Sequence, residues 1–190
     1  MQNQNHIFLL GFMGCGKTHW GRLLAEKTGM PFLDLDERIA TLSGKSISEI
    51  FTETGEPGFR VMERDALQSL VSLPTSIIAT GGGTPCFFDN LDWMNQIGTT
   101  IYLKTSPTLL AARLHHEKEF RPLLAEVQED DLHEFIAKKL EERERFYLQA
   151  KIVLEQKEGD KDFLNKMTEQ LEVRNAAKPN LNFHFFGLLE

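Results

Sequence analysis

The sequence predicts an α/β fold in which helices cover both faces of a central parallel sheet. Three observations lead to this class. Short β-rich runs alternate with helical patterns along the chain. A glycine-rich segment separates the first β-rich run from the first helical pattern. The length of 190 residues suits one domain that buries most of its apolar surface.

The elements can be justified in chain order. The β-rich runs predict five strands, at 6–10, 31–36, 75–80, 99–104 and 151–155. Helical patterns cover 17–28, 46–51, 58–71, 106–116, 129–148 and 160–172. Gly29 is a good terminator for the first helix, and Ser46 with Glu49 has the spacing of a capping box. We expect one domain over 1–172, with a polar excursion near 114–128 and an appendage over 173–190.

Composition excludes several classes of function. The net charge is −7 and no long basic tract occurs, so we expect no nucleic-acid partner. No apolar stretch approaches the roughly 20 residues that cross a bilayer, so we expect no membrane partner. The N-terminus has no signal-peptide pattern, and Cys15 and Cys86 lack metal-ligand spacing. We therefore expect a cytoplasmic protein with free thiols.

The segment from Gly11 to Thr18 reads GFMGCGKT and matches the phosphate-binding loop G-x-x-x-x-G-K-[ST] at every fixed position. A strand is predicted before it and a helix after it, as the motif requires. The glycines let backbone N–H groups curl around a polyphosphate at the positive end of the following helix. Lys17 would reach the β- and γ-phosphates, and the Thr18 hydroxyl would bind Mg²⁺. The motif does not identify the second substrate.

Two carboxylates, Asp34 and Asp36, end the second predicted strand. On a strand, residues i and i+2 share a face, and the carboxyl ends of parallel strands line the ligand crevice. The pair could hold Mg²⁺ waters, accept hydrogen bonds from substrate hydroxyls, or take a proton from an attacking hydroxyl. The alternative is one helix-capping aspartate beside one surface aspartate.

Two helices each place a charge on an apolar stripe. Glu63 lies on the stripe of the 58–71 helix, and Arg60, one turn earlier, is its nearest partner. Arg143 continues the inner stripe of the 129–148 helix, whereas Arg145 points elsewhere. Because guanidinium groups suit carboxylates, inward arginines predict an anionic ligand. The alternatives are a solvated pair for Arg60 and Glu63, and a snorkelling side chain for Arg143.

Two further segments favour a ligand site. Gly81, Gly82 and Gly83 follow the third predicted strand, where bare backbone allows a ligand to approach N–H donors closely. Arg121 lies in the polar excursion, and an arginine on a mobile lid could stabilise a transferring phosphate. By itself, an exposed loop arginine is the more common reading.

Together, the phosphate loop, DLD, FxxxGExxFR, GGG, RPLL and a late RxxxY resemble the shikimate kinase family, over about residues 6–172. The resemblance implies a P-loop NTPase three-layer sandwich of the nucleoside-monophosphate-kinase type, with a lid at about 114–128. It implies transfer of phosphate from ATP to the 3-hydroxyl of shikimate, on the route to chorismate and the aromatic amino acids. It also implies ATP and Mg²⁺ as cofactors, and we expect a monomer.

The resemblance assigns roles to the matching residues. Asp36 would hold the substrate hydroxyls and act as the base, and Asp34 would serve the metal through water, together with Thr18. Arg60 and Arg143 would bind the carboxylate; Arg145 is the alternative to Arg143 if the late motif is shifted. Backbone donors would come from Gly81, Gly82 and Gly83. The nucleotide site would consist of Gly14, Cys15, Gly16, Lys17, Thr18, His19, Arg113 and Arg121, of which Lys17 and Arg121 are catalytic.

Two other functions stay possible from the residues. A gluconate-type sugar-acid kinase shares the phosphate loop and a carboxylated polyol substrate. A nucleotide-binding module without turnover would also need the loop, but it would not need Asp36, Arg60 and Arg121.

Overall fold

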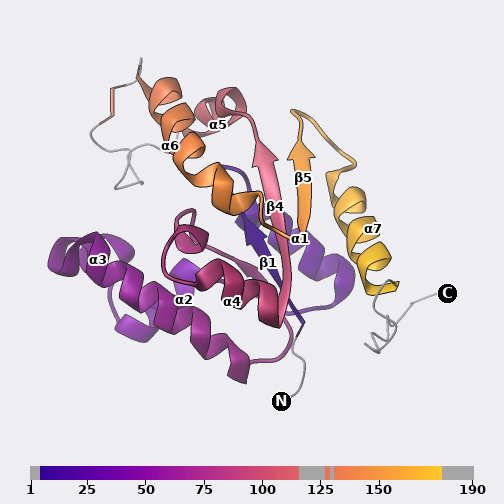
Figure 1. Ribbon diagram of the computed structural model, residues 1–190, viewed down its shortest axis with the longest axis horizontal. Helices are drawn as coiled ribbons and strands as arrows, with labels where there is room; N and C mark the ends of the chain where they lie inside the picture. Colours follow the sequence, from indigo (N-terminus) through magenta and orange to yellow (C-terminus); the bar gives the residue numbers. More distant parts are fainter. Residues whose placement is uncertain (1–4, 116–126, 129–130, 177–190) are drawn as a thin grey trace.

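A five-stranded parallel sheet forms the centre of the molecule (Figure 1). The computed structural model describes residues 5–115, 127–128 and 131–176. The strands run in the order β2-β3-β1-β4-β5, with bounds β1 His6–Leu10, β2 Phe32–Asp34, β3 Ile77–Ala79, β4 Gly98–Thr105 and β5 Ile152–Gln156. The register pairs Leu9 of β1 with Ala79 of β3 and with Ile101 of β4. The predicted fold class is confirmed.

Seven helices among the described residues surround this sheet. Figure 1 shows α3, α4 and α6 on one side of the strands, and α1 and α7 on the other. Within these layers α1 packs against α7, α2 against α3, and α5 against α6. Their bounds are α1 Lys17–Thr28, α2 Leu35–Ser43, α3 Ile47–Gln68, α4 Asn90–Ile97, α5 Pro107–Leu114, α6 Leu132–Tyr147 and α7 Phe163–Ala176, with 3₁₀ turns η1 Ser69–Ser72 and η2 Thr84–Cys86.

The first two predicted elements agree with the structure at both ends. β1 is buried along its whole length, which explains its continuous apolar run. The C-cap of α1 is Gly29 in the left-handed conformation, with φ 69°, a position that favours glycine. The capping box is also confirmed, because Ser46 Oγ accepts from Glu49 N at 3.2 Å and Glu49 Oε2 accepts from Ser46 N at 2.7 Å.

The structure differs from the predicted elements at the second strand and at α4, and it explains the two helical patterns of α3. The strand expected over 31–36 ends at Asp34, and Asp36 lies in the first turn of α2. The chain turns there because Asp34 Oδ1 accepts from Asp36 N at 3.1 Å, which caps the new helix. The helical patterns predicted at 46–51 and 58–71 both lie in α3, and non-helical backbone at Gly55 (φ 65°, ψ −178°) makes a kink between them, so their separation is confirmed. Helix α4 was not predicted.

The apolar core lies between the sheet and its helices. Its largest fully buried side chains include Phe8, Phe12, Tyr102, Tyr147 and Phe163. No helix in the described part of the chain is long and apolar enough to cross a membrane.

The carboxyl ends of β1, β2 and β3 lead into the glycine-rich loop, Asp34 and the triple-glycine turn, so the motifs predicted to act together meet at one edge of the sheet.

Candidate functional site

The phosphate-binding loop has the predicted strand–loop–helix context. Gly14 and Gly16 have φ of 77° and 89°, a region that L side chains rarely adopt. Lys17 Nζ folds back over the loop and donates to Gly11 O at 2.8 Å and to Phe12 O at 3.0 Å. The Lys17 amine therefore lies at the phosphate-binding loop, and its two partners are backbone carbonyls. Cys15 is fully buried and fills the space beneath the loop.

A cleft opens over this loop and contains most of the predicted nucleotide residues. Its lining includes Gly14, Gly16, Lys17, Thr18, His19, Asp34, Asp36, Gly81, Gly82 and Arg113. Arg113 reaches the loop from α5. Its Nη1 donates to Gly14 O in the loop at 3.3 Å and to Gln156 Oε1 at the end of β5 at 2.5 Å. The structure thus brings α1, α2, α5 and the glycine turn to one concave surface.

Thr18 and Asp34 lie together on the floor of this cleft. Thr18 Oγ1 donates to Asp34 Oδ2 at 2.8 Å. A hydroxyl and a carboxylate oxygen at this separation form the type of donor set that hard cations such as Mg²⁺ prefer. The two residues predicted for the metal therefore fit such an ion.

Arg60 and Glu63 form a buried ion pair beside the glycine turn. Arg60 is 5% exposed and Glu63 is 0% exposed, and Arg60 Nη1 donates to Glu63 Oε2 at 2.8 Å. The predicted pairing is confirmed. Burial by itself lowers the pKa of the Arg60 guanidinium, but Glu63 and Glu56 outweigh it, so the pKa of Arg60 is raised. Arg60 is a permanent cation in a fixed position.

Two partners of this pair were not assigned a role from the sequence. Glu56 Oε1 accepts from Arg60 Nη2 at 2.8 Å, and Thr84 Oγ1 donates to Glu63 Oε1 at 2.5 Å. The spacing of Glu56, one turn before Arg60, was a usable signal. No sequence pattern near Thr84 predicts its contact with Glu63, because the two residues are 21 positions apart and meet only in the folded chain.

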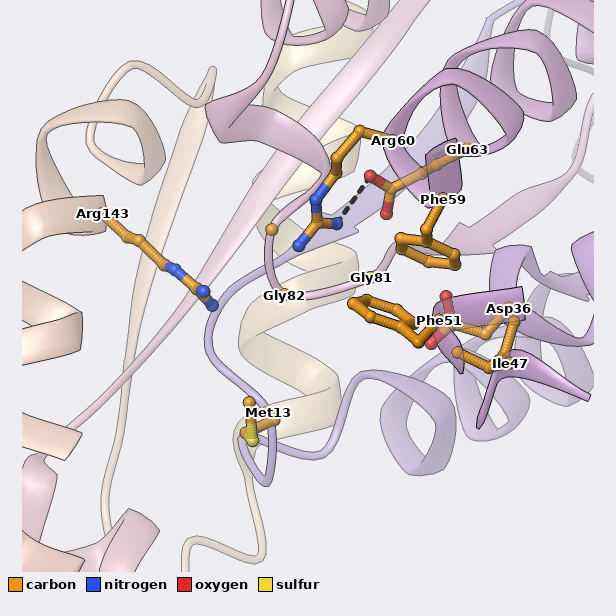
Figure 2. A pocket seen from close by; sticks show the side chains of 11 residues that line it. Met13, Asp36, Ile47, Phe51, Phe59, Arg60, Glu63, Gly81, Gly82 and Arg143 are labelled. Carbon is orange, nitrogen blue, oxygen red and sulfur yellow. Dashed lines mark hydrogen bonds and ion pairs between the residues drawn. The ribbon is translucent and has the colours of Figure 1, made fainter. Parts of the chain in front are cut away.

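The second arginine of the pocket is Arg143, on α6. Figure 2 shows the guanidinium groups of Arg60 and Arg143 pointing toward the glycine turn from two different helices. Arg143 is half-buried and lies over the Phe12 ring, 5.6 Å from its centroid. Arg145 is exposed and stacks on Phe146 at 4.8 Å. The structure therefore places Arg143, and not the alternative Arg145, in this pocket.

Each residue of the triple-glycine turn is tightly surrounded. A Cβ on Gly81 would lie 2.6 Å from Glu63 Oε1, and one on Gly83 would lie 2.5 Å from Arg60 Nη2. A Cβ on Gly82 would lie 3.2 Å from the backbone nitrogen of Met13. Side chains at these positions would displace the ion pair or press on the phosphate loop, because the turn touches both.

The pocket between α3, α6 and the turn adjoins the phosphate cleft. Its polar part includes Asp36, Arg60, Glu63 and Arg143, and its apolar side includes Met13, Ile47, Phe51 and Phe59 (Figure 2). Met13 belongs to the phosphate loop, and Phe51 and Phe59 belong to the FxxxGExxFR motif, whereas Ile47 lies outside the quoted motifs. The pocket and the cleft share Met13, Asp36, Gly81 and Gly82. Two ligands bound in them would be neighbours, with Asp36 at the junction.

One predicted site residue, Arg121, lies outside the described residues, as does most of the predicted lid. The other predicted residues are all placed. All but Cys15 line the cleft or the pocket, in agreement with the grouping expected from the motifs.

Comparisons with known proteins agree with this geometry. The family model described as "Shikimate kinase" matches residues 13–172. A shikimate kinase from Bacteroides thetaiotaomicron is 44% identical over 147 residues, which cover 77% of this chain and 84% of that protein.

Two solved structures are also similar. The shikimate kinase of Bacteroides thetaiotaomicron has a TM-score of 0.81 and 39% identity, covering 90% of this chain and 98% of that one. The shikimate kinase of Acinetobacter baumannii in complex with shikimate has a TM-score of 0.80 and 32% identity, covering 93% of this chain and 96% of that one.

Proposed function

This chain belongs to the shikimate kinase family, and we propose that it performs the family's reaction where its two pockets meet. The reaction is transfer of the γ-phosphate of ATP to the 3-hydroxyl of shikimate. The observation that best supports the proposed site is that two arginines line one pocket next to the phosphate cleft. Arg60 and Arg143 enter one pocket, and this pocket shares Asp36, Gly81 and Gly82 with the cleft over the phosphate loop.

The pocket suits a ring acid with several hydroxyls. The Arg60 and Arg143 guanidinium groups supply planar donors for one carboxylate. Phe51 and Phe59, whose ring centroids are 4.6 Å apart, supply an apolar surface for the carbon ring. The N–H groups of the glycine turn supply further donors. Because Glu56 and Glu63 hold Arg60 rigidly, little side-chain entropy is lost when the carboxylate binds.

Asp36 would act on the attacking hydroxyl. Its side chain lines both the acid pocket and the phosphate cleft, so it can accept a hydrogen bond from a hydroxyl directed at the γ-phosphate. Phosphoryl transfer depends mostly on positioning and charge stabilisation. Orientation of the hydroxyl would therefore contribute even before any proton is removed.

The phosphate loop would bind the donor. Lys17 would exchange the carbonyls of Gly11 and Phe12 for the β- and γ-phosphates. Thr18, with Asp34 through water, would hold Mg²⁺. When bound, the ion neutralises charge on the phosphates. Arg113 would lie beside the nucleotide, since it already touches the loop at Gly14. Arg121 is assigned to the lid by resemblance alone.

Shikimate-dependent release of ADP tests this function directly, in a coupled assay with gluconate as the competing acid. We expect turnover with shikimate and none with gluconate. Arg60→Ala should raise the KM for shikimate by about 10- to 100-fold, because hydrogen bonds between charged groups contribute about 1.5–3 kcal/mol each. Asp36→Asn should lower kcat by about 100-fold or more.

Arg64→Ala is the matched control for Arg60→Ala. Arg64 lies on the same helix, but its guanidinium pairs with Asp65 near the surface. We expect this variant to keep wild-type kinetics. Full activity in both Arg60→Ala and Asp36→Asn would show that the site is assigned to the wrong residues.

A further inference from the structure

A hydrogen bond joins the helix that carries Arg143 to the triple-glycine turn. Tyr147 lies one helical turn after Arg143 on α6 and is 0% exposed. Its hydroxyl donates to Gly82 O at 2.5 Å. The two segments are 65 residues apart in the sequence, so this contact exists only in the folded chain. Neither the proposed reaction nor the motifs assign a task to this hydroxyl.

The acceptor belongs to a peptide that faces both arginines. A Cβ on Gly82 would lie 3.7 Å from Arg143 Nη1, and one on Gly83 would lie 2.5 Å from Arg60 Nη2. In a planar trans peptide, the carbonyl of Gly82 and the N–H of Gly83 point in opposite directions. A donor that holds the Gly82 carbonyl therefore also sets the direction of the Gly83 N–H. Within the described residues, that N–H makes no backbone hydrogen bond.

The Tyr147 hydroxyl is suited to be a permanent donor. Burial raises the pKa of Tyr147 well above its ordinary value, so the hydroxyl stays protonated throughout the neutral range. The Tyr102 ring packs against the Tyr147 ring at 5.0 Å and limits its movement. The hydroxyl is consequently fixed in both place and protonation state.

We propose that Tyr147 is a positioning residue for the carboxylate of the substrate. Its hydroxyl sets the register of α6 against the glycine turn, so that Arg143 faces Arg60 across the Gly82–Gly83 peptide. It also directs the Gly83 N–H. This inference rests on the proposed function, because it needs the two arginines to bind the carboxylate. Tyr147 itself would touch no substrate.

Tyr147→Phe tests the inference, because it removes the hydroxyl and keeps the ring. We expect the KM for shikimate to rise about five- to tenfold, the size of one hydrogen bond lost from a buried site. The kcat and the KM for ATP should stay within about twofold, since the phosphate loop is unaltered. Tyr102→Phe is the matched control: it makes the same change on the neighbouring ring and should leave all three constants unchanged.

A double-mutant cycle separates positioning from general stability. We expect Tyr147→Phe and Arg143→Lys to be non-additive in the KM for shikimate, because the tyrosine acts through that arginine. An additive cycle would overturn the inference. So would a Tyr147→Phe protein with a lower Tm and an unchanged KM, which would make the bond purely structural. A wild-type protein without shikimate-dependent turnover would instead refute the proposed function.

Discussion

At the scale of single residues, the ion pair of Arg60 and Glu63 shows how a buried charge can serve a site. Such pairs contribute little net stability, because desolvation of both groups offsets their attraction. What the pair does provide is a fixed guanidinium. Glu63 was recognisable in the sequence because it interrupts an apolar stripe, and a carboxylate in that place needs a partner. Its second partner, Thr84, carried no such signal.

Arg143 and Arg145 offer a test by matched substitution. Arg143 lines the acid pocket, whereas Arg145 stacks on Phe146 at the surface. Arg143→Lys should raise the KM for shikimate by about tenfold, because lysine cannot reproduce a bidentate guanidinium. Arg145→Lys should leave it within about twofold. Steady-state kinetics with varied shikimate would measure both, and the reverse ranking would contradict the register of α6 described above.

At the scale of elements, the end of the second strand was predicted wrongly from the sequence. The run from Pro31 to Asp36 alternates as a strand should, yet β2 ends at Asp34 and α2 follows without a loop. The cap formed by Asp34 decides the boundary. The capping alternative was thus correct for Asp34. Asp36 nevertheless lines the site, because the first turn of α2 faces the same sheet edge.

Helix α1 provides a prediction about packing. Gly21 is buried, and a Cβ there would clash with the Phe32 ring and lie 3.2 Å from Leu9 Cδ1. Gly21→Ala should therefore destabilise the protein by about 1–3 kcal/mol, although alanine is the better helix former. Chemical denaturation would measure the loss. Glu26→Ala, at an exposed position of α1, should be neutral or slightly stabilising. Equal stability of the two variants would refute close packing of α1 on β2.

At the scale of the whole molecule, the strand order assembles the site. β1 lies between β3 and β4, and β2 lies beside β3. The segments that follow β1, β2 and β3 therefore meet at one edge. The phosphate loop, Asp34 and the glycine turn come from segments far apart in the chain, and parallel pairing brings their carboxyl ends together.

The stability of the whole fold should depend on His6 in mild acid. His6 Nδ1 accepts from Ser76 N at 3.1 Å, which leaves the proton on Nε2, 3.2 Å from Leu70 O. Burial lowers the pKa of His6 below its ordinary value of 6.5, so the folded state favours the neutral ring. This contribution is complete above about pH 6.5 and is lost as the pH falls through the lowered pKa.

We expect Tm to fall between pH 7 and pH 5, and the fall to be shallower in His6→Gln. His19→Gln, which alters an exposed histidine, should keep the wild-type slope. Differential scanning calorimetry at several pH values would measure the change of Tm with pH in each protein. Parallel slopes for the wild type and His6→Gln would mean that His6 does not link folding to protonation.

The sequence by itself determined the fold class, the phosphate loop, the capping box of α3 and the pairing of Arg60 with Glu63. Each depends on residues close together in the chain, where periodicity and backbone chemistry act directly. The position of Arg143 on the apolar stripe also predicted that it, rather than Arg145, faces inward. Only the tertiary structure decided that Arg143 shares its pocket with Arg60, that Thr84 donates to Glu63, and that Tyr147 donates to Gly82 O. Those contacts join distant segments, so their geometry follows from strand order and helix packing rather than from spacing.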